Sequence, residues 1–213
     1  MKPSGQKDLE NTYKLATPDD NVAYYRGFAQ TYDTDFVEQM GYCYPGAVAA
    51  AYLAQADIGA DVPIADIGCG TGIVASELKL RREIIDGMDI SPEMLSIARP
   101  KSLYRNLFEV DLTGDLQKIS NDYGAVLSAG TFTFGHLGTE PLRNLLQIAR
   151  RGALFVIGVN RAHFEKQGFS RTLDRMTEAG EIGPLEIGEI NIYAKQGHDH
   201  SADRALILRY RKT

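Results

Sequence analysis

The feature that most constrains the fold is a short apolar run, residues 62–67, that leads directly into the glycine-rich loop 68–72. An apolar run of this length, bounded by glycines, indicates a buried strand. Glycines placed directly after a strand let the backbone turn sharply into a helix and approach a ligand closely. The core is therefore expected to begin with a strand, a ligand-binding turn and a helix.

The glycine spacing separates this loop from two common phosphate-binding motifs. A dinucleotide fingerprint needs a glycine at position 73, which is isoleucine here, and no Lys-Ser/Thr pair follows as in a P-loop. Asp89 lies twenty-one residues beyond Gly68, directly after the next expected strand, where a carboxylate can accept both ribose hydroxyls. The alternative is an ordinary turn and a helix cap. We favour a nucleoside site without a pyrophosphate, because the loop and the carboxylate occur together.

Strands and helices alternate through the rest of the chain. Because parallel neighbours in a sheet need crossover connections, the alternation predicts an α/β fold with a mostly parallel sheet and helices on both faces. No helix separates the last two strands, which should therefore form an antiparallel hairpin. Strands are expected at 62–67, 83–88, 104–110, 125–129, 153–159, 185–193 and 205–210, and helices at 22–40, 45–56, 72–80, 91–99, 139–152 and 170–179.

The chain is predicted to form one domain with a polar N-terminal arm. Its 213 residues contain no linker rich in Pro, Ser or Gly. Seven of the nineteen aromatic residues fall within 24–44, which is too dense for an ordinary surface helix and favours a mobile lid. We divide the chain into an arm over 1–20, a helical lid and lead-in helix over 21–60, and the core over 61–213.

Composition narrows the partners and the compartment. The net charge of −5 offers no basic surface, so nucleic acid is not expected as a partner. Two cysteines cannot build a disulfide framework and favour a reducing compartment. No apolar stretch resembles a signal peptide or approaches the ~18 residues of a membrane span. A cytoplasmic protein without a membrane partner is expected, and its oligomeric state stays open.

Three segments together resemble the class I S-adenosylmethionine-dependent methyltransferases. Residues 66–72 are similar to their first motif, 89–95 to their second, and 108–112 to the end of their third strand. The aromatic lead-in with Tyr25 and Tyr32 resembles the lid helix of members that act on small molecules. The resemblance implies a Rossmann-like, seven-stranded, mostly parallel sheet with an antiparallel last strand. A narrower resemblance, over 128–137, is to the Williams–Beuren syndrome chromosome region methyltransferases.

This resemblance implies S-adenosylmethionine as the cofactor and assigns contacts to individual residues. The backbone of Gly68 and Gly70 would approach the methionine portion, and Asp66 would orient its amino group, directly or through water. Asp89 would bind the ribose, and Asp111 would accept a hydrogen bond from the adenine amino group. The complete set of cofactor-binding residues implied in this way is Tyr25, Tyr32, Asp66, Gly68, Cys69, Gly70, Gly72, Asp89, Ile90, Met94, Asp111, Leu112 and Ser128.

Some of these residues have an alternative explanation. Met94, which with Ile90 would pack on adenine, could instead be ordinary core packing from a helix. Asp111 could simply end a strand. Cys69 is small and is expected to be inert rather than a nucleophile.

The cofactor motifs do not identify the methyl acceptor. Displacement at a sulfonium has a good leaving group, so proximity and alignment can supply most of the acceleration, and a base is optional. Residues 128–131 differ from the Asn/Asp-Pro-Pro-aromatic motif that the resemblance associates with planar amino groups, and no Pro-Cys follows. Adenine, cytosine and glutamine amino groups and the pyrimidine C5 atom are therefore disfavoured.

Histidines are the candidates for the acceptor side of the site. Ligands bind at the carboxyl ends of strands in open α/β sheets, and His136 follows the fourth expected strand. Its unperturbed pKa near neutrality makes it our candidate catalytic residue, with a solvated loop histidine as the alternative. His163 is expected at the surface or an interface, and 198–200 as a polar turn rather than a metal site. No metal is expected.

The favoured function is methyl transfer from S-adenosylmethionine to a small-molecule acceptor. Two alternatives use the same fold: a methyltransferase that acts on protein or RNA, and a non-catalytic regulator that binds S-adenosylmethionine. A dinucleotide oxidoreductase is more distant, because position 73 is not glycine.

Overall fold

The computed structural model describes most of the chain from the aromatic lead-in onward. The expected N-terminal arm lies outside the described residues except for its last position, and so does Tyr25. None of the described helices has the length and apolar character that crossing a bilayer would require. The described residues are 20, 22–24, 26, 29–116 and 118–213.

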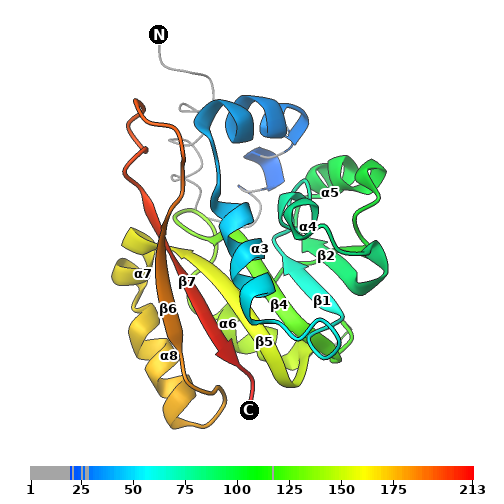
Figure 1. The fold of residues 1–213 in the computed structure, drawn as a ribbon, viewed down its shortest axis with the longest axis vertical. Coiled ribbons are helices and arrows are strands. Elements are labelled where there is room, and N and C mark those ends of the chain that lie inside the picture. Colours follow the sequence, from blue (N-terminus) through cyan, green and yellow to red (C-terminus); the bar gives the residue numbers. More distant parts are fainter. Residues whose placement is uncertain (1–19, 21, 25, 27–28, 117) are drawn as a thin grey trace.

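A seven-stranded sheet forms the centre of the molecule, in the order β3-β2-β1-β4-β5-β7-β6 (Figure 1). The first five strands run parallel, and β7 is antiparallel to both β5 and β6. This arrangement confirms the predicted α/β fold and the terminal hairpin. The strands are β1 (Ile64–Ile67), β2 (Ile85–Asp89), β3 (Asn106–Glu109), β4 (Tyr123–Phe132), β5 (Ala149–Asn160), β6 (Glu186–Asn191) and β7 (Arg204–Arg211).

Helices cover both faces of this sheet, as predicted. One hydrophobic cluster joins α3, α4 and α5 to the sheet, and a second joins α6, α7 and α8 to the opposite face. In the described part of the lead-in region, α-helical residues at 22–24 and 26 are followed by the 3-10 turn η1 (Ala29–Thr31) and the π-helix η2 (Tyr32–Glu38). The α-helices are α3 (Tyr44–Gln55), α4 (Ile73–Leu78), α5 (Pro92–Ala98), α6 (Pro141–Ile148), α7 (Arg161–Gln167) and α8 (Phe169–Glu178).

Two differences from the predicted elements bear on the site. The helix expected to reach residue 152 ends at Ile148, because β5 already begins at Ala149. Helix α7 was not predicted. It begins where the Asn160 side chain accepts a hydrogen bond from the His163 N–H, a short capped turn between a strand and α8.

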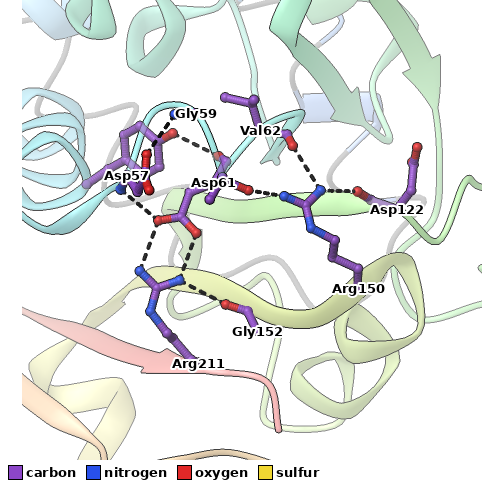
Figure 2. A network of polar contacts seen from close by, with 10 residues as sticks. Asp57, Gly59, Asp61, Val62, Asp122, Arg150, Gly152 and Arg211 are labelled. Carbon is purple, nitrogen blue, oxygen red and sulfur yellow. Dashed lines mark hydrogen bonds and ion pairs between the residues drawn. The ribbon is translucent and has the colours of Figure 1, made fainter.

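A polar network closes the amino-terminal edge of the sheet (Figure 2). Arg211 of β7 donates two hydrogen bonds to the buried Asp61 carboxylate, at 2.7 and 2.9 Å. Arg150 of β5 donates to the carbonyl oxygens of Val62 and Asp122, both at 2.9 Å. These contacts hold the loop before β1 against β4, β5 and β7.

Candidate active site

A cavity of about 290 Å³ opens at the carboxyl edge of the parallel strands. Its wall is built from the loops that follow β1, β2, β3 and β4, together with two tyrosines of the lead-in region. This is the edge where open α/β sheets bind ligands. The lining residues are Tyr32, Tyr42, Pro45, Gly68, Cys69, Gly70, Thr71, Ile73, Val74, Asp89, Ile90, Met94, Val110, Asp111, Leu112, Thr113, Ala129, Gly130, Thr131, His136, Leu137, Gly138, Glu140 and Pro141.

The glycine loop is held in place by Asp89. One carboxylate oxygen accepts from the Gly70 N–H at 2.8 Å, and the other accepts from the Ser91 N–H at 2.9 Å. Gly68 has φ +62° and Gly70 has φ +52°, a backbone conformation that suits glycine. Burial raises the pKa of Asp89, and hydrogen bonds from backbone N–H groups, including those of Ser91 and Gly70, offset only part of this shift. The loop and the carboxylate thus form one unit facing the cavity.

Part of the cavity lies over β2 and β3. It is lined by Ile90, Met94, Asp111 and Leu112, which the sequence predicted to contact the cofactor. Met94 is 3% exposed, so it packs in the wall of the cavity and in the interior at once. One Asp111 oxygen accepts from the Thr113 N–H at 2.9 Å and from the Thr113 hydroxyl at 2.7 Å, so Asp111 also shapes the turn after β3.

Three residues predicted to bind the cofactor do not line the cavity. Asp66 lies beneath the loop, where one oxygen accepts from the Tyr104 hydroxyl at 2.6 Å and the other has no hydrogen-bond partner within the described chain. Burial raises the pKa of Asp66 to about 7. Gly72 faces the Tyr104 ring, which a Cβ would approach to 3.1 Å. The Ser128 hydroxyl is buried and donates to the Ile67 carbonyl at 3.0 Å.

The opposite wall comes from β4 and the loop after it. The Thr131 hydroxyl donates to the Ile67 carbonyl at 3.1 Å and lies directly over Gly68. A Cβ on Gly68 would come within 2.0 Å of that hydroxyl oxygen, so only glycine fits there. A Cβ on Gly130 would come within 2.5 Å of the Tyr42 hydroxyl oxygen. The contacts of Thr131 with Gly68 and of Tyr42 with Gly130 could not be predicted from the sequence, since each joins segments that are distant in the chain.

His136 lines this wall, and its ring is half buried. Its Nδ1 lies 3.2 Å from the Phe134 carbonyl oxygen. A carbonyl only accepts, so Nδ1 carries the hydrogen and the ring lone pair is on Nε2. Burial lowers the pKa of His136 to about 4, and the nearby His163 adds to this shift. His136 is therefore neutral at pH 7 and a weak base.

His163 supports the loop that carries His136. It is 4% exposed, so the predicted surface position is wrong. Its Nε2 donates to the Leu137 carbonyl at 2.9 Å, and its ring meets the Phe134 ring edge-on at 5.0 Å. Burial lowers the pKa of His163, which keeps the ring neutral. The sequence did not reveal this contact because α7 was not predicted.

Residues 198–200 lie in the β6–β7 hairpin and do not line the cavity. The His200 ring pairs with the Asp203 carboxylate at 3.1 Å, and the His198 ring meets the Tyr193 ring edge-on at 5.0 Å. In the described part of the chain, no group of three or more His, Cys, Asp or Glu side chains is placed to hold a metal ion.

The lead-in region contributes Tyr32 and Tyr42 to the cavity wall, and polar contacts connect it to the loops around the cavity. Asp33 accepts from the Thr71 hydroxyl at 2.6 Å and from Lys101 at 2.5 Å. Arg26 pairs with Glu93 of α5 at 3.1 Å. The Phe36 ring packs between Tyr32 and Tyr42, with centroid distances of 5.2 and 5.1 Å. This aromatic packing accounts for the density of aromatic residues noted in the sequence.

The fold and the segment that carries the glycine loop define a class of protein. Residues 64–153, from β1 into β5, match the family model described as a methyltransferase domain. This segment is therefore similar to a methyltransferase domain, and the sheet that contains it has the Rossmann-like class I fold. The match to a methyltransferase domain supports S-adenosylmethionine as the cofactor.

A curated relative and two solved structures are similar to this chain. Human methyltransferase-like protein 27 is 31% identical over 122 residues, so the chain spans about half the length of this relative, 49%. A possible histamine N-methyltransferase from Thermotoga maritima has a TM-score of 0.59 at 16% identity, covering 90% of this chain and 97% of that one. A plantazolicin methyltransferase in complex with SAH has a TM-score of 0.59 at 15% identity, covering 98% and 95%. At these identities the two structures show the fold alone.

Proposed function

We propose that this protein transfers the methyl group of S-adenosylmethionine to a small-molecule acceptor by in-line displacement. The observation that carries the proposal is one cavity in which the Asp89-held glycine loop faces a second wall from β4. Such a cavity can hold the sulfonium and the acceptor side by side, and alignment alone can then supply most of the acceleration.

The cofactor in this proposal lies across the carboxyl edge of the sheet. Asp89 accepts from the ribose hydroxyls and Asp111 from the adenine amino group, while Ile90, Met94 and Leu112 pack against the base. The methionine portion lies over Gly68, Cys69 and Gly70, with Tyr32 above it. Asp66, Gly72 and Ser128 act from beneath the loop by holding its shape, and a role for Tyr25 stays a prediction.

His136 is proposed as the residue that orients the acceptor. Its neutral ring at pH 7 directs the Nε2 lone pair toward a donor, and its low pKa of about 4 favours orientation over proton removal. A general base is not required by the displacement itself.

A small acceptor is supported by the charge and the shape of the site. Described lining residues include no lysine or arginine, and the net charge of −5 gives no docking surface for RNA. The loop after β4 also carries the resemblance to the Williams–Beuren syndrome chromosome region methyltransferases, which we propose as the nearest subgroup. We further propose a cytoplasmic protein that acts without a membrane or nucleic-acid partner.

The experiment is a calorimetric titration followed by a transfer assay. S-adenosylmethionine and its demethylated product should bind and raise the melting temperature, and NAD should do neither. Binding of NAD alone would contradict the proposal. Cofactor binding without methylation of any acceptor, across small molecules, peptides and RNA, would favour the non-catalytic regulator, and methylation of peptides or RNA alone would favour the macromolecular alternative.

A further inference from the structure

The wall of the cavity over β4 has a charge pattern that selects the acceptor. The nucleoside residues belong to β2 and β3, so the space beside β4 is left for the second substrate. This wall consists of Tyr42, Gly130, Thr131, His136, Leu137 and Glu140.

Among the described residues that line the cavity, every charged side chain is acidic. Asp89, Asp111 and Glu140 line it, and no lysine or arginine does. Lys101 at its mouth is paired with Asp33 at 2.5 Å, and Lys166 lies 5.5 Å from the centroid of the Phe134 ring. An acceptor that carries a carboxylate or a phosphate would enter this space beside Glu140, with no lysine or arginine among the described lining residues.

The cavity also lacks a strong base within the described chain. Burial lowers the pKa of His136 to about 4 and raises the pKa values of the Tyr32 hydroxyl and the Cys69 thiol, so these two stay protonated at neutral pH. A phenol with a pKa of about 10 would have to give up its proton to a group of much lower affinity. The site favours a nucleophile whose lone pair is already available.

Two tyrosines give the same space aromatic walls. Tyr32 and Tyr42 both line the cavity and pack against the Phe36 ring, with centroid distances of 5.2 and 5.1 Å. Aromatic faces attract cations, and nearby carboxylates add to this attraction. The site is therefore suited to a flat ring that becomes positively charged.

We propose that the acceptor is a small, uncharged heteroaromatic compound that is methylated on a ring nitrogen to give a cation; this inference rests on the proposed function. The nitrogen lone pair forms the new N–CH₃ bond as the C–S bond breaks, and the electrons of that bond stay on sulfur. The positive charge moves from sulfur to the ring nitrogen, and no proton is released. Glu140 and the two tyrosines then face the new cation.

The test uses the full chain, the cofactor and a panel of one- and two-ring pyridines, imidazoles and quinolines. Each is paired with its carboxylate-substituted analogue and with a phenol of the same shape, and methylated products are measured by mass spectrometry. We expect kcat/KM for the uncharged nitrogen compounds to exceed that of the carboxylates at least tenfold, with no phenol methylation. Preference for the carboxylates or phenols would overturn the proposal.

Variants at Glu140 test the role of charge. Glu140→Lys should lower the ratio of kcat/KM for uncharged rings to kcat/KM for carboxylate-bearing rings at least fivefold. The isosteric Glu140→Gln should lower this ratio by less. An unchanged preference in both variants would overturn the assignment of this wall. Bound cofactor with no methylation of any nitrogen compound would overturn the acceptor class, whereas failure to bind the cofactor would overturn the proposed function itself.

Discussion

Carboxylates at the two edges of the sheet have different hydrogen-bond partners. At the amino edge, Asp61 is paired with Arg211, and Arg105 donates to Asp86 at 2.5 Å from one nitrogen and 3.0 Å from another. At the carboxyl edge, Asp66 and Asp89 accept hydrogen bonds from a hydroxyl and backbone N–H groups only. Figure 2 shows the Asp61–Arg211 pair of the amino edge, whereas no lysine or arginine is among the described residues that line the cavity.

Strand β2 contains both cases within four residues. Burial alone would raise the pKa of Asp86, but hydrogen bonds from Arg105 and Tyr123 outweigh it and the pKa is lowered. Asp89 is buried without a cation, and its pKa is raised. The comparison teaches that carboxylates at the amino edge, which stabilise the fold, are paired with arginines. The carboxylates at the carboxyl edge, Asp66 and Asp89, have no arginine or lysine partner among the described residues, so a cationic ligand can bind beside them. S-adenosylmethionine carries both a sulfonium and an ammonium group.

The largest expected effect is on stability and comes from removing the Asp61–Arg211 ion pair at the amino edge. Arg211→Met leaves the Asp61 carboxylate, 3% exposed, with the Asp57 N–H at 2.9 Å as its remaining hydrogen bond among those described. We predict a loss of about 3 kcal/mol in the free energy of unfolding, measured by urea denaturation, with the cofactor Kd unchanged within twofold.

Arg209→Met is the matched control on the same strand. Arg209 pairs with the exposed Glu186 at 3.4 Å, and a surface pair of this kind is worth less than about 1 kcal/mol. A large fall in cofactor affinity for Arg211→Met would mean that the two edges are coupled and that the comparison fails.

The second effect is a pH dependence that originates at Asp66. Its pKa is about 7 in the folded protein and near 3.9 in an unfolded chain, so the folded state holds the proton more tightly. Stability should therefore fall as pH rises from about 4 to 7, by up to about 1.4 kcal/mol per pH unit. Asp66→Asn should remove this slope in thermal or urea unfolding measured across that range.

Tyr104→Phe sharpens the same test. The Tyr104 hydroxyl lowers the pKa of Asp66, so its removal should extend the falling part of the stability curve to higher pH. If Asp66→Asn kept the slope of the parent protein, another group would be responsible for it.

The third effect falls on cofactor affinity. Asp89→Ala should weaken cofactor binding at least tenfold in calorimetry, since hydrogen bonds to a charged group are worth about 1.5–3 kcal/mol each. Stability should change little, because the lost bonds to the Gly70 and Ser91 N–H groups are offset by removal of a buried charge without a cation.

Asp86→Ala on the same strand should do the reverse. It breaks the Arg105 pair and the 2.8 Å bond from the Tyr123 hydroxyl, so it should lower stability and leave cofactor affinity within twofold. Equal losses of affinity in both variants would contradict a special role for Asp89.

The sequence predicted the parts of the site that depend on local spacing. The glycine loop, Asp89 and Met94 follow strand ends and helix starts, and all three line the cavity. Asp66 does not line the cavity, because its carboxylate lies beneath the loop and accepts from the Tyr104 hydroxyl, a contact that local spacing does not reveal. The Asp61–Arg211 pair joins residues 150 positions apart, and no local pattern reveals it.

The functional loop after β4 shows the same limit. Residues 128–137 were recognised by resemblance, yet the contacts of Thr131 with Gly68 and of Tyr42 with Gly130 come from packing between segments distant in the chain. The unpredicted helix α7 brings His163 under this loop. Sequence spacing therefore identified the cavity residues after β1, β2 and β3 better than the contacts of the loop after β4.

The smallest expected effect tests whether His163, which does not line the cavity, positions the loop after β4. His163→Leu removes the 2.9 Å hydrogen bond to the Leu137 carbonyl and should cost about 1 kcal/mol of stability. It should also raise the acceptor KM severalfold with the cofactor Kd unchanged, because Leu137 lines the cavity in the loop after β4, which we propose faces the acceptor.

His163→Gln keeps a side-chain N–H that can donate to the same carbonyl, so it should restore the acceptor KM to within twofold of the parent protein. The pKa of His163 is lowered by burial, so this residue should contribute a loss of stability as pH falls below about 6.5, opposite in sign to the contribution of Asp66. The glutamine variant should lack this loss. If both variants raised the acceptor KM equally, the histidine would act through packing on Phe134 rather than through its hydrogen bond, and the acceptor wall would depend on its own residues alone.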